Sequence, residues 1–175
     1  QELKKKLPLM LAAAAQFQES HQIAVACAAT ISLDVYQTYC KGYDVHLSTG
    51  HTYDLLSIAD LALVTSGTAT LETALFHVPQ VVCYKGSAIS IWLAKKLVKI
   101  QYISLVNLIL QQNAVSELIQ EDCTVANMHA ELQKLLPGKP QRQAQLTKYA
   151  DLQALLQESG VSERVANSMN TYLPS

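Results

Sequence analysis

The sequence lacks the signals of several function classes. Its four cysteines form no Cys-x-x-Cys pair, so neither a zinc ribbon nor a redox dithiol is indicated. Its five histidines show no ligand spacing, and we expect no metal and no other cofactor. It has no basic surplus, because the net charge is -1, and this argues against a nucleic-acid partner. No apolar run approaches the roughly 18 residues of a membrane-spanning helix.

What is present is apolar. Half of the 175 residues are hydrophobic and only 15% are charged, which is typical of a well-buried globular domain. Cys27 and Cys83 lie in apolar, strand-like runs, where we expect them to act as small hydrophobic residues. Widely spaced cysteines of this kind favour a reducing, cytosolic setting.

Apolar strand-like runs alternate with segments of helical periodicity over the first 105 residues. The expected strands are residues 23–28, 43–47, 60–65, 80–84 and, as a short one, 103–105. The expected helices are residues 3–19, a segment after Ser32, 52–58, a segment from the 66–68 turn to about 77, and 87–98. This alternation predicts an α/β fold, a Rossmann-like parallel sheet with helices on both faces. The turns at 48–52, 65–68 and 84–87 then meet at the carboxyl edge, where such sheets bind ligands.

From about Val125 the pattern is helical. Pro137-Gly138-Lys139-Pro140 is a break, and residues 141–157 and 161–172 read as two further helices with few strong core residues. We therefore expect a domain over 1–136 and a helical tail over 137–175 that returns to a partner domain or a second subunit. The first residue, Gln1, resembles the interior of a chain entering a helix, so we expect the C-terminal part of a longer protein.

The most informative stretch is Ser66-Gly67-Thr68-Ala69-Thr70-Leu71-Glu72, a small-residue turn between an expected strand and an expected helix. Free N–H groups at a helix start favour an anion, most often phosphate. Glu72 follows about one turn later, where a carboxylate can accept hydrogen bonds from sugar hydroxyls. The alternative is an ordinary helix cap with a Glu that complements the helix dipole, and the spacing alone leaves both open.

Four blocks in order carry a resemblance to a known family: residues 66–72, then Val-Val-Cys-Tyr-Lys at 81–85, Trp-Leu-Ala-Lys-Lys-Leu-Val-Lys at 92–99, and Tyr-Ile-Ser-Leu-Val-Asn-Leu at 102–108. The set resembles the C-terminal half of lipid-A-disaccharide synthase, a bacterial glycosyltransferase with the two-domain GT-B fold. The resemblance covers roughly residues 1–125, and the tail matches only in being helical.

The resemblance implies a reaction. The family joins UDP-2,3-diacylglucosamine to 2,3-diacylglucosamine 1-phosphate, with inversion at the donor carbon, and releases UDP. The C-terminal half binds the UDP-sugar donor, whereas the N-terminal half binds the lipid acceptor and supplies the general base. This chain is then expected to hold the donor half and to be inactive alone.

The resemblance also implies site residues. Ser66, Gly67, Thr68, Ala69 and Thr70 would cradle the diphosphate, and Glu72 would accept the ribose hydroxyls. A loop of Gly50, His51 and Thr52 would face the uracil, and Asn107 matches a family asparagine near the reaction centre. Lys85 is placed to add a cation beside the leaving UDP, or is an ordinary surface lysine.

Two departures from the family pattern bear on this site. Val106 stands where the family usually has proline, which predicts a looser loop around Asn107. A family Gly-Ser-Arg loop of the nucleotide site would lie immediately before Gln1. Without it, we expect weak donor binding and no catalysis by this chain.

The segment Trp92–Lys99 combines apolar residues with three lysines. Such a helix can lie on an anionic membrane surface, or can be a crossover helix with its apolar face on the sheet. The first reading, with the lipid substrates, favours a cytoplasmic protein peripheral on the inner face of the bacterial inner membrane. A homodimer through the tail is a further expected partner. Two rival functions stay open: another GT-B enzyme, such as a UDP-N-acetylglucosamine transferase or 2-epimerase, and a non-catalytic nucleotide-binding or dimerising module.

Overall fold

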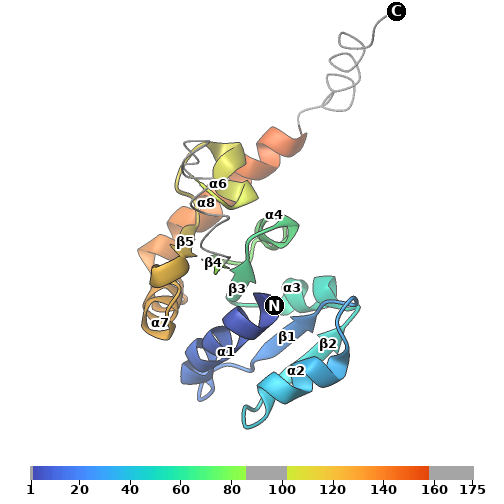
Figure 1. The fold of residues 1–175 in the computed structure, drawn as a ribbon. Coiled ribbons are helices and arrows are strands. Elements are labelled where there is room, and N and C mark those ends of the chain that lie inside the picture. The colour runs from blue at the N-terminus through green and yellow to red at the C-terminus, as the bar shows by residue number, and fades with distance from the viewer. Residues whose placement is uncertain (1, 86–101, 158–175) are drawn as a thin grey trace, which may run out of the picture.

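The computed structural model describes residues 2–85 and 102–157 (Figure 1). The strands in these ranges are short and are β1 (Ala24–Cys27), β2 (His46–Thr49), β3 (Ala62–Thr65), β4 (Gln80–Tyr84) and β5 (Ser116–Ile119). The α-helices are α1 (Glu2–Ala14), α2 (Leu33–Cys40), α3 (Thr52–Ile58), α4 (Thr68–Leu75), α6 (Leu105–Leu110), α7 (Val125–Gln133) and α8 (Pro140–Gln157). Single 3-10 turns follow α1 (Ala15–Phe17) and β5 (Gln120–Asp122).

Every strand pair is parallel. β1 pairs with β2 in an outer sheet, and β3, β4 and β5 pair in that order in an inner sheet. In the inner sheet Val82 of β4 lies between Val64 of β3 and Glu117 of β5. Parallel neighbours require crossover connections, and α2 connects β1 to β2 while α4 connects β3 to β4; α3 leads from the outer sheet to the inner one. The fold is the α/β, Rossmann-like arrangement that the alternating pattern predicted.

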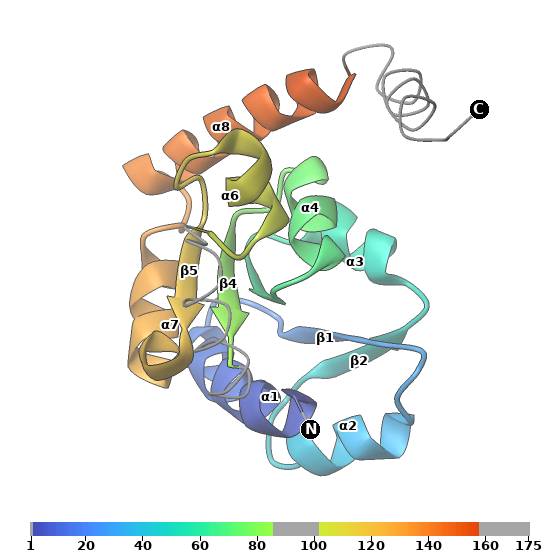
Figure 2. The same cartoon turned by 45° about the horizontal axis from the view of Figure 1, so that its top comes forward.

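Strand β4 is the centre of the core. Its side chains alternate: Val81 and Cys83 pack with residues of α1 and α7, whereas Val82 packs with residues of α4, α6 and α8. The first cluster includes Ala13, Met128 and Leu132, and the second includes Ala74, Val106, Tyr149 and Leu152. Figure 2 shows α1 beside α7, with α4, α6 and α8 gathered together elsewhere on the inner sheet. The inner sheet is therefore covered on both faces.

A third cluster supports the outer sheet. It joins α1, β1 and α2 through Leu7, Leu11, Cys27, Tyr36 and Cys40. Cys27 and Cys83 are buried free thiols within the core, as the apolar runs around them predicted.

The strand predicted at 103–105 is wrong. Ser104 is instead the N-cap of α6, because its hydroxyl accepts the N–H of Asn107 at 3.3 Å. The strand that completes the inner sheet is β5, which the sequence reading missed because Glu117 interrupts its apolar run. The segment Trp92–Lys99 and the helix expected over 161–172 lie outside the described residues.

Helix α8 matches the helix predicted at 141–157. It packs on the same chain through Tyr149 and Leu152, which are 1% and 0% exposed. Gln145 adds a polar contact to β4, since its side-chain amide accepts the N–H of Gln80 at 2.7 Å and donates to the Gln80 carbonyl at 3.1 Å. The division of the chain into 1–136 and 137–175 stays a prediction.

Candidate functional site

The carboxyl edge of the two sheets gathers most of the residues singled out in the sequence. β2 runs into Gly50 and α3, β3 runs into the Ser66-Gly67 turn and α4, and β4 ends just before Lys85. Parallel strands deliver all three turns to one edge, where helix starts and open loops are available to a ligand.

The Gly67 turn leaves main-chain amides exposed. Gly67 has φ +146°, a conformation that side chains rarely adopt, so glycine is required by the backbone rather than by lack of space. Its carbonyl accepts both the N–H and the hydroxyl of Thr70, at 3.2 and 2.8 Å. Within residues 2–85 and 102–157, no acceptor takes the N–H groups of Gly67, Thr68 or Ala69. Three adjacent donors at a helix start can hold an anionic group.

The side chains of this turn are less available than its amides. Thr70 is fully buried, and its hydroxyl is committed to Gly67. The Ser66 hydroxyl donates to the carbonyl of Ile103 at 3.0 Å, which ties the turn to the segment before α6. Of the residues expected to cradle the diphosphate, the structure therefore leaves the main-chain amides around Gly67 and the side chain of Thr68 exposed.

A pocket of about 350 Å³ joins the two loops expected to meet. Its lining is Gly50, His51, Thr52, Tyr53, Asp54 and Glu72. Gly50 needs its positive φ of +80° to turn the chain from β2 toward α3. The pocket thus brings the expected uracil loop and the expected ribose carboxylate to the same hollow, although Gly50 and Glu72 are 22 residues apart in the sequence.

Two contacts shape the pocket wall. The Nδ1 atom of His51 lies 2.9 Å from a carboxylate oxygen of Asp54, which fixes the imidazole ring. Tyr53 stacks on Phe76 with ring centroids 5.4 Å apart and planes inclined by 17°, so the wall formed by α3 leans on the end of α4. The sequence reading missed Tyr53 and Asp54, although a His and an Asp three residues apart at a helix start are a recognisable pair.

Asn107 does not lie in this pocket. It is fully buried, and both ends of its amide are occupied. Its Oδ1 atom accepts the N–H groups of Ala114 and Val115, and its Nδ2 atom donates to the Val115 carbonyl and to Glu117. The catalytic role implied for Asn107 stays a prediction, and in this structure its side chain has no free hydrogen-bonding group.

Lys85 lies half-buried beyond the end of β4. A hydrogen bond between two buried thiols raises the pKa of Cys83 and lowers the pKa of Cys123. Burial opposes the lowering of the Cys123 pKa, and the charges of Lys85 and Lys6 add to it. The ammonium of Lys85 therefore acts partly on the protein interior, and its role beside a diphosphate stays a prediction.

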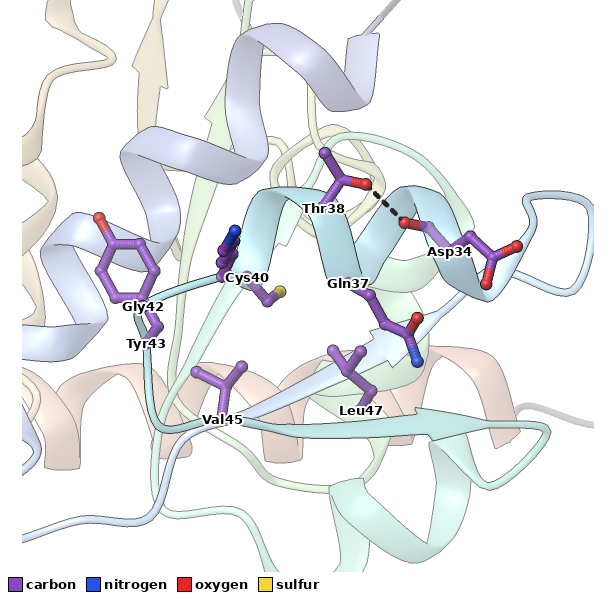
Figure 3. A pocket seen from close by; sticks show the side chains of 9 residues that line it. Asp34, Gln37, Thr38, Cys40, Gly42, Tyr43, Val45 and Leu47 are labelled. Carbon is purple, nitrogen blue, oxygen red and sulfur yellow. Dashed lines mark hydrogen bonds between the residues drawn. The ribbon is translucent and has the colours of Figure 1, made fainter.

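A larger pocket, of about 560 Å³, lies between α2 and β2. Figure 3 shows Val45, which precedes β2, and Leu47 of β2 pointing toward Cys40 and Gln37 on α2. Its polar lining comes from the exposed side of α2 and from Lys41 and Tyr43 just beyond that helix, and it shares no residue with the pocket around Glu72. It contains none of the residues that the sequence singled out.

Over the described ranges, no three His, Cys, Asp or Glu side chains gather in a way that would hold a metal ion. Over the same ranges, no helix combines the length and the apolar character needed to cross a bilayer.

Comparison with known proteins shows the family of this chain. The sequence model of the family described as Lipid-A-disaccharide synthetase matches residues 1–169. A lipid-A-disaccharide synthase of Anaeromyxobacter dehalogenans is 38% identical over 174 residues, which is 96% of this chain and 45% of that protein. The synthase of Chromohalobacter salexigens is 44% identical over 74% of this chain and 33% of its own length, and that of Gloeothece citriformis is 34% identical over 99% and 47%. The chain spans less than half the length of these relatives, and it belongs to the lipid-A-disaccharide synthetase family.

Proposed function

We propose that this chain is the donor-binding half of a glycosyltransferase of lipid A biosynthesis. The donor is UDP-2,3-diacylglucosamine and the acceptor is 2,3-diacylglucosamine 1-phosphate. Support comes from family membership and from one observation: the open amides of Gly67, Thr68 and Ala69 and the pocket of Glu72 belong to the same helix start.

The reaction is an inverting displacement. The 6-hydroxyl oxygen of the acceptor forms a bond to the anomeric carbon of the donor, and the bond from that carbon to the β-phosphate oxygen breaks. The electron pair of the broken bond stays with UDP, and the hydroxyl proton passes to a general base outside this chain. Because negative charge grows on the leaving UDP, fixed N–H donors around Gly67 stabilise the transition state more than the ground state.

The remaining roles complete the proposal. Glu72 accepts the ribose hydroxyls, the Gly50-His51-Thr52 loop faces the uracil, and Lys85 adds positive charge near the diphosphate. The acceptor lipid binds to the N-terminal half of the protein. The Trp92–Lys99 segment contacts the inner face of the bacterial inner membrane, and the tail from 137 contributes to a homodimer.

Calorimetry of UDP binding to the full-length protein tests the donor site. We expect Glu72→Ala to weaken UDP binding about tenfold, the effect of losing one to two hydrogen bonds to a charged group. Glu19→Ala is the matched control, because Glu19 is exposed and precedes β1 at the opposite edge of the sheet. With 2′,3′-dideoxy-UDP, which lacks the ribose hydroxyls, wild type and Glu72→Ala should bind equally.

Equal UDP affinity in Glu72→Ala and wild type would refute the assignment of Glu72. UDP binding without sugar transfer by the full-length protein would favour the non-catalytic nucleotide-binding module. Transfer or epimerisation of UDP-N-acetylglucosamine would favour another GT-B enzyme.

A further inference from the structure

Glu117 on β5 is a carboxylate that no described cation neutralises. It accepts four hydrogen bonds instead: from the N–H of Ile103 and the N–H of Ser104, both at 2.9 Å, from the Ser104 hydroxyl at 2.7 Å, and from the Asn107 amide at 2.8 Å. Three of these donors belong to the segment that leads into α6. An ionised carboxylate can only accept, so Glu117 sets the direction of every hydrogen bond around it.

The peptide group between Ile103 and Ser104 links Glu117 to the other side of the inner sheet through hydrogen bonds. Its N–H donates to Glu117, and its carbonyl accepts the hydroxyl of Ser66 at 3.0 Å. Glu117 lies on β5 and Ser66 follows β3, so this peptide bridges the two outer strands of the inner sheet across β4. Hydrogen bonds on both sides of one peptide strengthen each other, because each polarises the group that makes the other.

Ser66 is the residue immediately before Gly67, whose N–H and the two that follow have no acceptor in the described ranges. Fixing Ser66 therefore fixes the first of the open amides. We propose that Glu117 is a positioning residue for the anion-binding turn. It acts through the Ile103–Ser104 peptide and Ser66 to hold the amides of Gly67, Thr68 and Ala69 in place for the leaving diphosphate, and it does not contact the substrate itself. This inference rests on the proposed donor site.

Positioning of this kind has a chemical purpose. Donors held in place before the reaction need no reorganisation as charge develops, and a small displacement of a binding group costs much of its effect. Gly67 itself is conformationally permissive, so the rigidity of the turn has to come from its neighbours. Glu117 supplies this rigidity without touching the ligand, because its hydrogen bonds orient the groups that do. Residues that orient metal or phosphate ligands act in the same way.

The test compares the affinities of the full-length protein for UDP and for uridine, which lacks the phosphates. Glu117→Gln puts an N–H₂ group among donors, and we expect UDP affinity to fall about tenfold with at most a twofold change for uridine. Glu131→Gln is the matched control, because Glu131 is a partly buried carboxylate that accepts a hydrogen bond from Ser116, the neighbour of Glu117. Its UDP affinity should stay within about twofold of wild type.

Ser66→Ala breaks the same connection at its other end and leaves Glu117 intact. We expect the double variant Ser66→Ala, Glu117→Gln to bind UDP no more weakly than the weaker single variant, since both changes break one path. Losses that multiply in the double variant, or a Glu117→Gln loss that is equal for UDP and uridine, would overturn the inference. If Glu117→Gln fails to fold, the UDP-to-uridine ratio of Ser66→Ala decides the question alone.

Failure of the proposed function has a separate signature, which is a wild-type protein that does not bind UDP at all. The inference is then decided by hydrogen exchange of the peptide covering 66–72. Exchange that is faster in Glu117→Gln than in Glu131→Gln supports the positioning role, and equal exchange in the two variants overturns it.

Discussion

The inner and outer sheets of this chain are built in different ways. In the inner sheet, four of the five residues of β4 are buried, β3 and β5 have one buried residue each and no exposed one, and polar side chains from α6 and α8 are buried beside them. In the outer sheet, Cys27 is the only buried residue of β1 and Ser48 the only buried residue of β2. The candidate site takes Glu72 and the Gly67 amides from the inner region and the Gly50–Asp54 loop from the outer one.

The difference separates two tasks. The inner region fixes groups in place through buried hydrogen bonds, which suits donors that must meet a developing charge. The outer region presents an exposed loop on a thinly packed sheet, which suits recognition of a group that is not reacting. Substitutions in the two regions should therefore differ in their effect on stability, with the largest effect in the inner region.

Asn107→Ala should destabilise the protein most. It leaves the N–H and the carbonyl of Val115 buried without their side-chain partner, whereas the N–H of Ala114 keeps the Gln112 carbonyl at 2.9 Å. Each buried group left unsatisfied costs about 1–3 kcal/mol, so we expect the free energy of unfolding to fall by about 3–4 kcal/mol in urea titrations. Asn127→Ala, in which an exposed amide loses one bond to the Asp122 carbonyl, should cost less than about 1 kcal/mol. Equal losses of unfolding free energy in the two variants would contradict the view that the buried hydrogen bonds of Asn107 stabilise the inner region.

Leu152→Ala should come next, at about 2–4 kcal/mol, because it leaves a cavity in the cluster around Val82. Leu155 lies on the same helix but is 45% exposed, so Leu155→Ala should cost no more than about 0.5 kcal/mol. Thermal unfolding of the two variants measures the difference. If Leu152→Ala were as mild as Leu155→Ala, α8 would not belong to the stable core of the inner region.

The fold was largely predictable from the sequence, for a physical reason. Strands such as 80–84 are continuous apolar runs bounded by turns, and burial on both faces of a parallel sheet demands that pattern. The pattern failed where a polar network replaced apolar burial. Glu117 interrupts the apolar run of β5, so the sequence did not predict that strand. Residues 103–105 were predicted to be a strand, although Ser104 caps a helix.

The candidate site was predictable only in part. Gly67 and Glu72 share a local signal, a turn before a helix, and the resemblance to the family added Gly50. Neither signal reports which side chains face inward. The bridge from Glu117 to Ser66 depends on contacts between residues 13 and 37 positions apart, and Asn107 is held by residues 7 to 10 positions away on the next strand and its leading turn. Such contacts leave no periodicity in a single sequence.

Two buried tyrosines compare the regions directly. The Tyr149 hydroxyl accepts from the Gln80 side chain at 3.1 Å and donates to Gln145 at 3.0 Å, whereas the Tyr36 hydroxyl accepts one N–H, that of Ala28, at 2.9 Å. We expect Tyr149→Phe to cost about 1–2 kcal/mol and Tyr36→Phe about 0.5–1 kcal/mol in urea titrations. The reverse order would contradict the view that the inner region is the more tightly bonded.

The dependence of stability on alkaline pH should also distinguish Tyr149 from Tyr36. Burial raises the pKa of Tyr149 above its ordinary value of 10.0, although hydrogen bonds from Gln80 oppose the shift. A raised pKa means that the folded state favours the neutral phenol, so this stability is complete below about pH 10 and declines as the pH rises further. Wild type and Tyr36→Phe should lose stability steeply above that pH, whereas Tyr149→Phe should lose it less steeply. Parallel pH profiles for all three proteins would remove Tyr149 as the cause.

The smallest effect on stability is expected in the outer region, at the His51–Asp54 pair. Both side chains are largely exposed, at 70% and 80%, so Asp54→Asn should change the free energy of unfolding by no more than about 0.5 kcal/mol. Asp34→Asn is the matched control, since Asp34 is an exposed carboxylate in the first turn of α2, as Asp54 is in the first turn of α3. If the Gly50–Asp54 loop faces the nucleobase, Asp54→Asn should still weaken UDP binding about threefold, because the His51 ring loses the partner that orients it, while Asp34→Asn leaves UDP binding unchanged. An unchanged UDP affinity in both variants would mean that the His51–Asp54 pair does not contribute to UDP binding. It would contradict the proposal that the outer region recognises the nucleobase.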